Sequence, residues 1–160
     1  VFFTFLVKTS EIILIIFISL QKMDLDILKI ASETNNKKSL KNYTHNSKLK
    51  NSICGDEVHI KLIMKKNKII DFSHEGNSCI YCQASASLLS KVSVNKEKIK
   101  IDNLCFDAES YFNGNSEKIR KKSKKFKKLF NKKNLSRKEC ILLPFKTFKK
   151  LKQINVCKKN

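Results

Sequence analysis

Proline and glycine are scarce in this chain of 160 residues, which contains one proline and three glycines. Their scarcity excludes a linker-rich or collagen-like chain. Arginine is also scarce, since Arg120 and Arg137 are the only two among 34 basic residues. A nucleic-acid binder that relies on bidentate contacts to phosphates and bases usually contains more arginine. The net charge of +20 therefore indicates mainly solvated lysines and a compositional bias, and the alternative is an acidic partner.

A secretory cleavage pattern is absent, although the chain contains six cysteines. Their spacing differs from that of a compact disulfide scaffold, so we expect reduced thiols in the cytoplasm, where cysteine serves metal and sulfur chemistry. The hydrophobic content of 41% is sufficient for a core, and the length fits one domain. No internal repeat is visible.

The first 22 residues are apolar, but Lys8 and Glu11 interrupt them. A membrane-spanning helix needs about 20 apolar residues with few charges, and a signal peptide carries its charge before the apolar run. Because Met23 follows at once, we expect residues 1–22 to be an extension upstream of the natural start. The alternative is a membrane anchor, which requires that these residues are translated.

Residues 23–50 are expected to form a short N-terminal helix and a polar arm. Apolar residues recur between Met23 and Ala31 in a pattern that predicts an amphipathic helix. Residues 32–50, which include His45, are polar and unpatterned and predict a loop. Residues 51–156 are then expected to form the main domain.

An antiparallel hairpin is predicted at about residues 56–75. The turn falls at residues 65–68, and the return strand extends to about His74. Apolar residues alternate along the first strand and would share one face: Val58, Ile60, Leu62 and Met64.

Helical patterns follow the hairpin. Residues 80–92 carry small and apolar residues four apart, and residues 107–112 predict a short helix after a polar stretch. A last amphipathic helix is expected after Cys140, with Pro144 in its first turn, where the missing N–H costs nothing.

Residues 118–133 are strongly basic and are expected to form a helix whose apolar side chains bury one face. Ile119, Phe126, Leu129 and Phe130 are interleaved with the basic residues, and Ile119, Phe126 and Phe130 would share that face. The lysines would then be a solvated cationic face. Docking onto an acidic surface is the alternative, followed by binding to DNA, for which no recognised motif is present.

A possible metal site follows from the positions of three cysteines and one aspartate. Cys54 and Asp56 are two apart and would point to one side of an extended segment, with Gly55 allowing a bend. Cys79 and Cys140 both lie near expected helix starts, where the helix dipole lowers the pKa of a thiol. Three thiolates and a carboxylate suit Zn²⁺ or an iron–sulfur cluster. On spacing alone, unrelated core cysteines remain the alternative.

Several motifs, in order, resemble the iron–sulfur scaffold family of IscU, SufU and the NifU N-terminal domain. They are Cys54-Gly55-Asp56, Asp71-Phe72-Ser73-His74-Glu75-Gly76, Cys79 followed by Gln83-Ala84-Ser85-Ala86-Ser87, and Arg137-x-x-Cys140 with Leu143-Pro144-Phe145. The resemblance covers about residues 47–155. The long gap between Cys79 and Cys140 resembles the SufU-type branch, and Glu139 stands where IscU-like members carry histidine.

The resemblance implies an α+β fold in which a small antiparallel sheet is flanked by helices. It implies that Cys54, Asp56, Cys79 and Cys140 bind a transient [2Fe–2S] cluster or Zn²⁺, and that Cys54 is a candidate sulfur acceptor. The expected partners are a cysteine desulfurase and apo iron–sulfur acceptor proteins, and no nucleic acid. The protein would be a carrier and not an enzyme. The alternative is a structural zinc-binding module whose basic helix docks on nucleic acid or an acidic partner.

Two departures from the family pattern concern the loop before Cys79 and the helix after it. Ser78 stands where the family has glycine, so the turn is expected at Gly76-Asn77. Cys82 occupies a position that usually holds a small residue. It is interpreted as a small helix residue rather than as the partner of Cys79 in a redox dithiol.

The other cysteines, the histidines and Arg137 are weaker candidates for functional residues. Cys105 and Cys157 are expected to be buried or incidental. His59 and His74 are expected to be surface or capping residues, with His74 as an outside candidate for a ligand. Arg137 is either an ion-pair partner or a stabiliser of the Cys140 thiolate. Asp56, a harder ligand than a fourth thiolate, is expected to keep a cluster labile.

Overall fold

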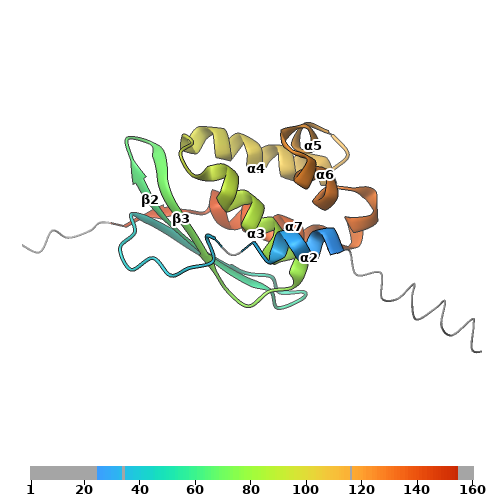
Figure 1. Cartoon of the computed structure of the whole chain (residues 1–160), viewed down its shortest axis with the longest axis horizontal. Coiled ribbons are helices and arrows are strands. Elements are labelled where there is room, and N and C mark those ends of the chain that lie inside the picture. Colours follow the sequence, from blue (N-terminus) through green and yellow to red (C-terminus); the bar gives the residue numbers. More distant parts are fainter. Residues whose placement is uncertain (1–24, 34, 116, 155–160) are drawn as a thin grey trace, which may run out of the picture.

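The computed structural model describes residues 25–33, 35–115 and 117–154, in which a four-stranded antiparallel sheet is packed against helices (Figure 1). The order of the strands across the sheet is β3-β2-β1-β4. Their bounds are β1 (His45–Lys50), β2 (Glu57–Lys65), β3 (Lys68–Glu75) and β4 (Lys152–Gln153). The α+β fold class with a flanked antiparallel sheet is confirmed.

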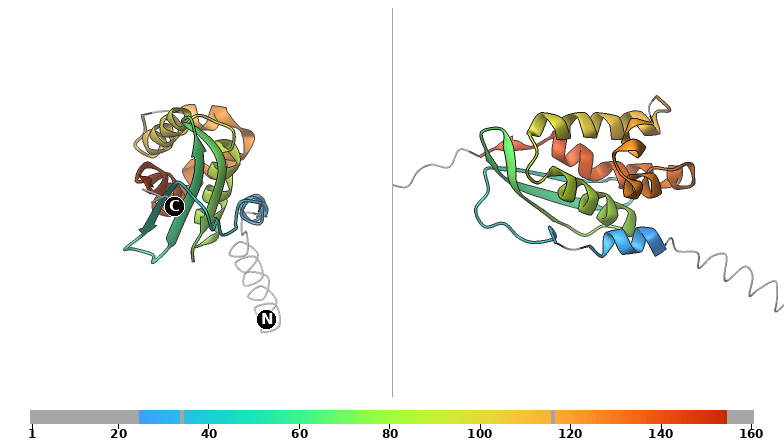
Figure 2. Two further views of the ribbon diagram at one scale, coloured as in Figure 1. Left: turned by 90° about the vertical axis from the view of Figure 1, so that its left-hand side faces the viewer. Right: turned by 45° about the horizontal axis from the view of Figure 1, so that its top comes forward.

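Helices α3 and α7 pack against the sheet, α2 packs on α3, and α4 packs on α7. Figure 2 shows that α4 lies beyond α7, farther from the sheet. The helices are α2 (Leu25–Ala31), α3 (Ile80–Ser93), α4 (Lys98–Phe112), α5 (Lys118–Lys122), α6 (Lys124–Leu129), the 3₁₀ helix η1 (Lys132–Arg137) and α7 (Lys138–Lys149). Within the described residues, no helix is long and apolar enough to cross a bilayer. Residues 1–22, the expected extension, lie outside the described residues.

The predicted hairpin is confirmed in its strands and in its turn. Lys66 and Asn67 both have positive φ angles, of 45° and 61°, as a two-residue type I′ turn requires. The alternating residues of β2 are buried at Val58, Ile60 and Leu62. A bulge after Ile63 shifts the register of the strand pairing.

The prediction of a loop was wrong for residues 45–50, which form β1 between β2 and β4. The sequence of β1, HNSKLK, lacks an apolar alternation, so its pattern could not reveal the strand. Backbone hydrogen bonds to neighbours on both sides stabilise it instead, with His45 opposite both Leu62 of β2 and Gln153 of β4.

Helix α4 is longer than predicted, because it begins at Lys98 and not near residue 107. Its buried residues Ile101, Leu104, Cys105 and Ala108 follow a helical spacing of three and four. The polar residues between them concealed this spacing.

The basic segment of residues 118–133 is not one helix. Ser123 ends α5 and begins α6, and its hydroxyl accepts hydrogen bonds from the amides of Lys125 and Phe126. Ile119, Phe126 and Phe130 are buried as predicted, but Ile119 lies on α5, Phe126 on α6 and Phe130 directly after α6.

The last helix, α7, begins at Lys138 and therefore contains Cys140 in its first turn. Pro144 lies inside the helix and not in the first turn as predicted. A proline nitrogen carries no hydrogen, so Pro144 cannot bond the carbonyl of Cys140 four residues earlier. The early start of α7 places Cys140 on a buried helical turn.

Gly76 makes the turn that the sequence predicted between β3 and Cys79. Its φ is +142°, and a Cβ atom there would lie 2.0 Å from the carbonyl oxygen of Glu57. That oxygen belongs to the backbone of β2, which cannot move without disturbing the sheet. Gly76 therefore allows the close approach that brings the chain back beside the start of β2.

Replacement of Gly76 by alanine should lower the free energy of unfolding by about 3 kcal/mol or more, because it adds a backbone clash to an unfavourable φ. Gly114 is a matched control, since its φ is +78° and a Cβ would meet no atom within 4 Å. Gly114→Ala should cost only about 1 kcal/mol. Urea denaturation measures both values, and equal costs for the two variants would contradict this explanation.

Candidate metal centre

Cys54 and Asp56 lie on a tight loop between β1 and β2. The amide of Asn51 donates to the Asp56 carbonyl at 2.7 Å, and the amide of Gly55 donates to the Asn51 carbonyl at 2.9 Å. The Asn51 side chain also accepts from the amide of Ile53 at 2.9 Å. These bonds, with Gly55 at a φ of +76°, hold Cys54 and Asp56 in place. Sequence reasoning missed Asn51, although asparagine commonly bonds the backbone two residues ahead.

Small residues on α3 allow α7 to approach it closely. Ala84, Ser85 and Ala86 are buried, and the Ser85 hydroxyl donates to the Ile141 carbonyl at 2.5 Å. Ile141 follows Cys140 directly, so this bond fixes the first turn of α7 against α3. The small-residue run was the signal in the sequence, but the role of Ser85 was not predicted.

The structure brings Cys54, Asp56 and Cys140 together, with ligand atoms that all lie within 4.8 Å of one another. The sulfur atoms of Cys54 and Cys140 are 3.8 Å apart. The Cys79 thiol is not part of this group, but the amide of Cys79 donates to Asp56 Oδ1 at 3.0 Å and so places the start of α3 beside it. Three segments distant in sequence thus meet where the β1–β2 loop, the start of α3 and the start of α7 adjoin.

The geometry of this cluster suits a metal ion or an iron–sulfur cluster. Two thiolates that each lie about 2.3 Å from a tetrahedral ion are about 3.8 Å apart, which equals the separation of the Cys54 and Cys140 sulfurs. Asp56 Oδ2 is buried and has no hydrogen-bond partner among the described residues. A buried carboxylate oxygen without a partner is costly, and coordination to a cation would satisfy it.

Burial opposes ionisation of the thiols in the metal-free protein, contrary to the prediction for Cys79. Burial raises the pKa of the Cys79 thiol, and the nearby Asp56 adds to the increase. Burial also raises the pKa of the Cys140 thiol, and the nearby Cys79 adds to the increase. The helix dipole was expected to dominate, but loss of water around the sulfur is the larger effect. Cys54, in contrast, is exposed.

The other cysteines behave as the sequence predicted where the structure describes them. Cys82 and Cys105 are completely buried, and burial raises the pKa of both thiols. Cys157 lies outside the described residues.

Arg137 and Glu139 flank Cys140 but contact other residues. The guanidinium of Arg137 lies 5.8 Å from the centre of the Tyr81 ring, which is a cation–π contact. Glu139 pairs with Lys146 at 2.6 Å. Arg137 therefore joins the start of α7 to the start of α3.

His74 was an outside candidate for a ligand, and His59 and His74 were expected at the surface. His74 is buried instead, and its Nε2 has no hydrogen-bond partner among the described residues. Burial and the nearby charge of Lys37 lower the pKa of His74 to about 4. His74 is therefore neutral in the folded protein at pH 7.

His74 should make the protein less stable in acid. The unfolded chain binds a proton at His74 below about pH 6.5, whereas the folded chain does so only below about pH 4. Stability should therefore fall by about 3 kcal/mol as the pH decreases through this window. Urea denaturation at several pH values should show a smaller loss for His74→Gln than for the wild type. Equal losses would contradict the prediction.

Comparison with known proteins identifies a family model that matches residues 25–108, the NifU-like N terminal domain. A protein of Borreliella burgdorferi is 34% identical over 132 residues, which are 82% of this chain and 83% of the relative.

Two solved structures share the fold. One is a protein from Fervidobacterium islandicum AW-1 assigned as the iron–sulfur cluster assembly scaffold SufU of the SUF system. It has a TM-score of 0.71 and 26% identity over 78% of this chain and 91% of that chain. The other is the N-terminal part of a nitrogen-fixing NifU-like protein from Brucella abortus. It has a TM-score of 0.65 and 22% identity over 76% of this chain and 85% of that chain, and supports the fold alone.

Proposed function

Because this chain belongs to the NifU-like N-terminal domain family, we propose that it assembles an iron–sulfur cluster on its own cysteines and passes it to acceptor proteins. Cys54, Asp56, Cys79 and Cys140 are the proposed ligands. The cargo would be a transient [2Fe–2S] cluster, and Zn²⁺ is the alternative occupant of the same site.

One observation carries this proposal. The ligand atoms of Cys54, Asp56 and Cys140 come from two distant segments and lie within 4.8 Å of one another. Cys79 adjoins this group through the hydrogen bond from its amide to Asp56 Oδ1. Three sulfur donors and one oxygen donor match the preferences of zinc and of iron–sulfur clusters. The carboxylate is the weaker donor for iron, which suits a cluster that must leave.

Cys54 is the proposed entry point for sulfur, since it is exposed whereas Cys140 is buried. Its thiolate would attack the outer sulfur of a persulfide on a cysteine desulfurase. A new S–S bond would form on Cys54 as the S–S bond of the desulfurase breaks, and the desulfurase thiolate would leave with the electron pair. Ile53 beside Cys54 is 84% exposed, so an apolar contact is available to the partner.

The experiment combines the reduced, metal-free protein with a cysteine desulfurase and cysteine, and locates persulfides by mass spectrometry of alkylated peptides. We expect one added sulfur on Cys54, and its loss in Cys54→Ser. Cys105→Ser is the matched control, because Cys105 is completely buried, and it should leave the modification unchanged. Absence of any persulfide on Cys54, Cys79 or Cys140 would contradict sulfur acceptance.

The same experiment separates the second candidate function, a structural zinc module. A structural site holds zinc permanently and would accept no sulfur. Removal of the zinc ion with a chelator would then unfold the chain. We expect instead that the metal-free protein keeps its fold, because its core contains large buried side chains on the sheet and the helices, such as Phe72, Phe126 and Phe148.

A further inference from the structure

A groove of about 270 Å³ lies on the helical side of the molecule, away from Cys54, Cys79 and Cys140. Its apolar lining consists of Val92 at the end of α3, Ile101 and Leu104 of α4, and Phe126 of α6. Its remaining lining residues are three exposed lysines, Lys96, Lys100 and Lys122. The groove thus combines a cationic rim with a floor of largely buried apolar side chains, of which Val92 is half-buried.

The positive charge of the lysines at the rim of the groove is only partly neutralised by carboxylates. Lys100 pairs with Glu97 at 3.3 Å. No carboxylate of the described residues forms an ion pair with Lys96 or Lys122. Residues 118–133, which supply Lys122 and Phe126, contain nine lysines, one arginine and no acidic residue. Arg120, Lys125 and Lys128 of this segment pair with carboxylates outside it, so Lys96 and Lys122 supply the positive charge of the rim.

We infer that this groove binds an acidic peptide segment of a partner protein, in which one apolar side chain enters the groove and flanking carboxylates face Lys96 and Lys122. Charge complementarity would attract and orient such a segment. The apolar anchor would supply contact area that a purely ionic encounter lacks.

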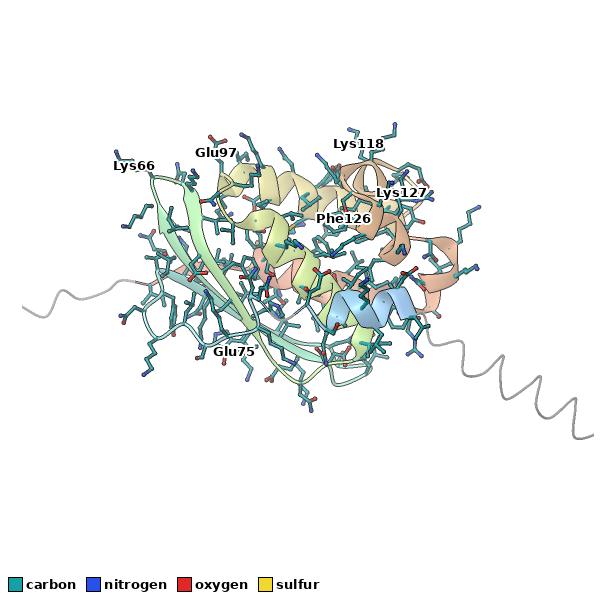
Figure 3. The ribbon with its side chains drawn as sticks, viewed as in Figure 1. Lys66, Glu75, Glu97, Lys118, Phe126 and Lys127 are labelled. Atoms are coloured by element: carbon teal, nitrogen blue, oxygen red, sulfur yellow. The ribbon has the colours of Figure 1, made fainter. Side chains whose placement is uncertain are left out.

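Nucleic acid and membranes fit these residues less well. Figure 3 shows Lys118 and Lys127 at the outer edge of α5 and α6, while Phe126 lies among the helices and is fully buried. Residues 118–133 contain a single arginine, the residue that usually makes bidentate contacts to phosphates and bases. The apolar residues of α5 and α6 are buried as well, so these helices offer no apolar side chain for insertion into a lipid surface.

The groove is separate from the candidate metal centre. Cys79 precedes α3 and Val92 lies near its end, so the rise of the helix places them about 20 Å apart. A partner could therefore occupy the groove while the cysteines remain accessible. The inference does not depend on the proposed function, because peptide binding requires no cluster.

Fluorescence anisotropy of the full chain with a labelled peptide tests this inference at physiological ionic strength. The probe carries Asp and Glu residues around a central Leu-Phe pair, and a second peptide has Ser-Ser in place of that pair. We expect the Leu-Phe peptide to bind at least about fivefold more tightly. The double variant Lys96→Glu and Lys122→Glu should weaken its binding at least about tenfold.

The control variant reverses Lys132 and Lys133, which are exposed cations of the same basic segment outside the groove. It makes the same change in net charge and should weaken binding less than about threefold. Equal losses in the two variants, or equal affinities for the two peptides, would overturn the inference in favour of general charge attraction. Tighter binding of a single-stranded oligonucleotide or of anionic vesicles, lost in the groove variant, would overturn it as well.

Discussion

Replacement of Cys140 by serine should weaken the binding of Zn²⁺ at least about 100-fold and prevent retention of a cluster. The Cys140 sulfur is buried and lies 3.8 Å from the Cys54 sulfur, so it would be a central donor. A serine hydroxyl keeps its proton at neutral pH and is a poor donor for zinc or iron. Competition with a chromophoric chelator measures the zinc affinity, and visible absorption after anaerobic reconstitution measures the cluster.

The matched control is Cys105→Ser, which makes the same atomic change at a buried cysteine of α4 outside the site. We expect an unchanged metal affinity and a small loss of stability. Circular dichroism of both variants excludes unfolding as the cause of any loss. If Cys140→Ser bound zinc as tightly as the control variant, Cys140 would not be a ligand.

Replacement of Asp56 by alanine should slow the transfer of a cluster to an apo acceptor about tenfold. The buried Oδ2 has no other partner among the described residues, and as a hard oxygen donor it would bind iron more weakly than a thiolate. If Asp56 is a ligand as proposed, its loss would leave only the sulfur donors, which would release the cluster more slowly. Transfer to apo-ferredoxin, followed by visible circular dichroism, gives the rate.

Asp56→Asn separates ligation from the structural role of this residue. The Asp56 carboxylate also accepts a hydrogen bond from the Cys79 amide, and an asparagine oxygen can retain that bond while donating less charge to a metal. We expect Asp56→Asn to keep the fold of the loop and to transfer the cluster more slowly than the wild type. Transfer from Asp56→Ala as fast as from the wild type would contradict the labilising role.

The local patterns of this chain predicted the elements in which one face is apolar. The hairpin and α3 were recognisable because Val58, Ile60 and Leu62 alternate and because small residues recur along α3. Strand β1 was not recognisable, since neighbouring strands stabilise its polar sequence. The break at Ser123 was also missed, because lysines on both sides favour a helix and only the serine hydroxyl marks a new start.

The residues of the candidate metal centre were predictable from the sequence, but their arrangement in space was not. The motifs around Cys54, Cys79 and Cys140 indicated the family, which the comparisons confirm. The sequence could not show that Ser85 fixes α7 against α3, or that burial controls the Cys79 thiol. Both depend on packing between segments that are distant in sequence, such as Ser85 and Ile141, which are 56 residues apart, and no local pattern records such packing.

The most direct test of the proposed four-residue site is X-ray absorption spectroscopy of the zinc-loaded full chain. We predict about three sulfur neighbours at about 2.3 Å and one oxygen neighbour at about 2.0 Å, with the oxygen lost or replaced in Asp56→Ala. A zinc environment without sulfur, or one that is identical after removal of Cys54, Cys79 and Cys140, would contradict the site.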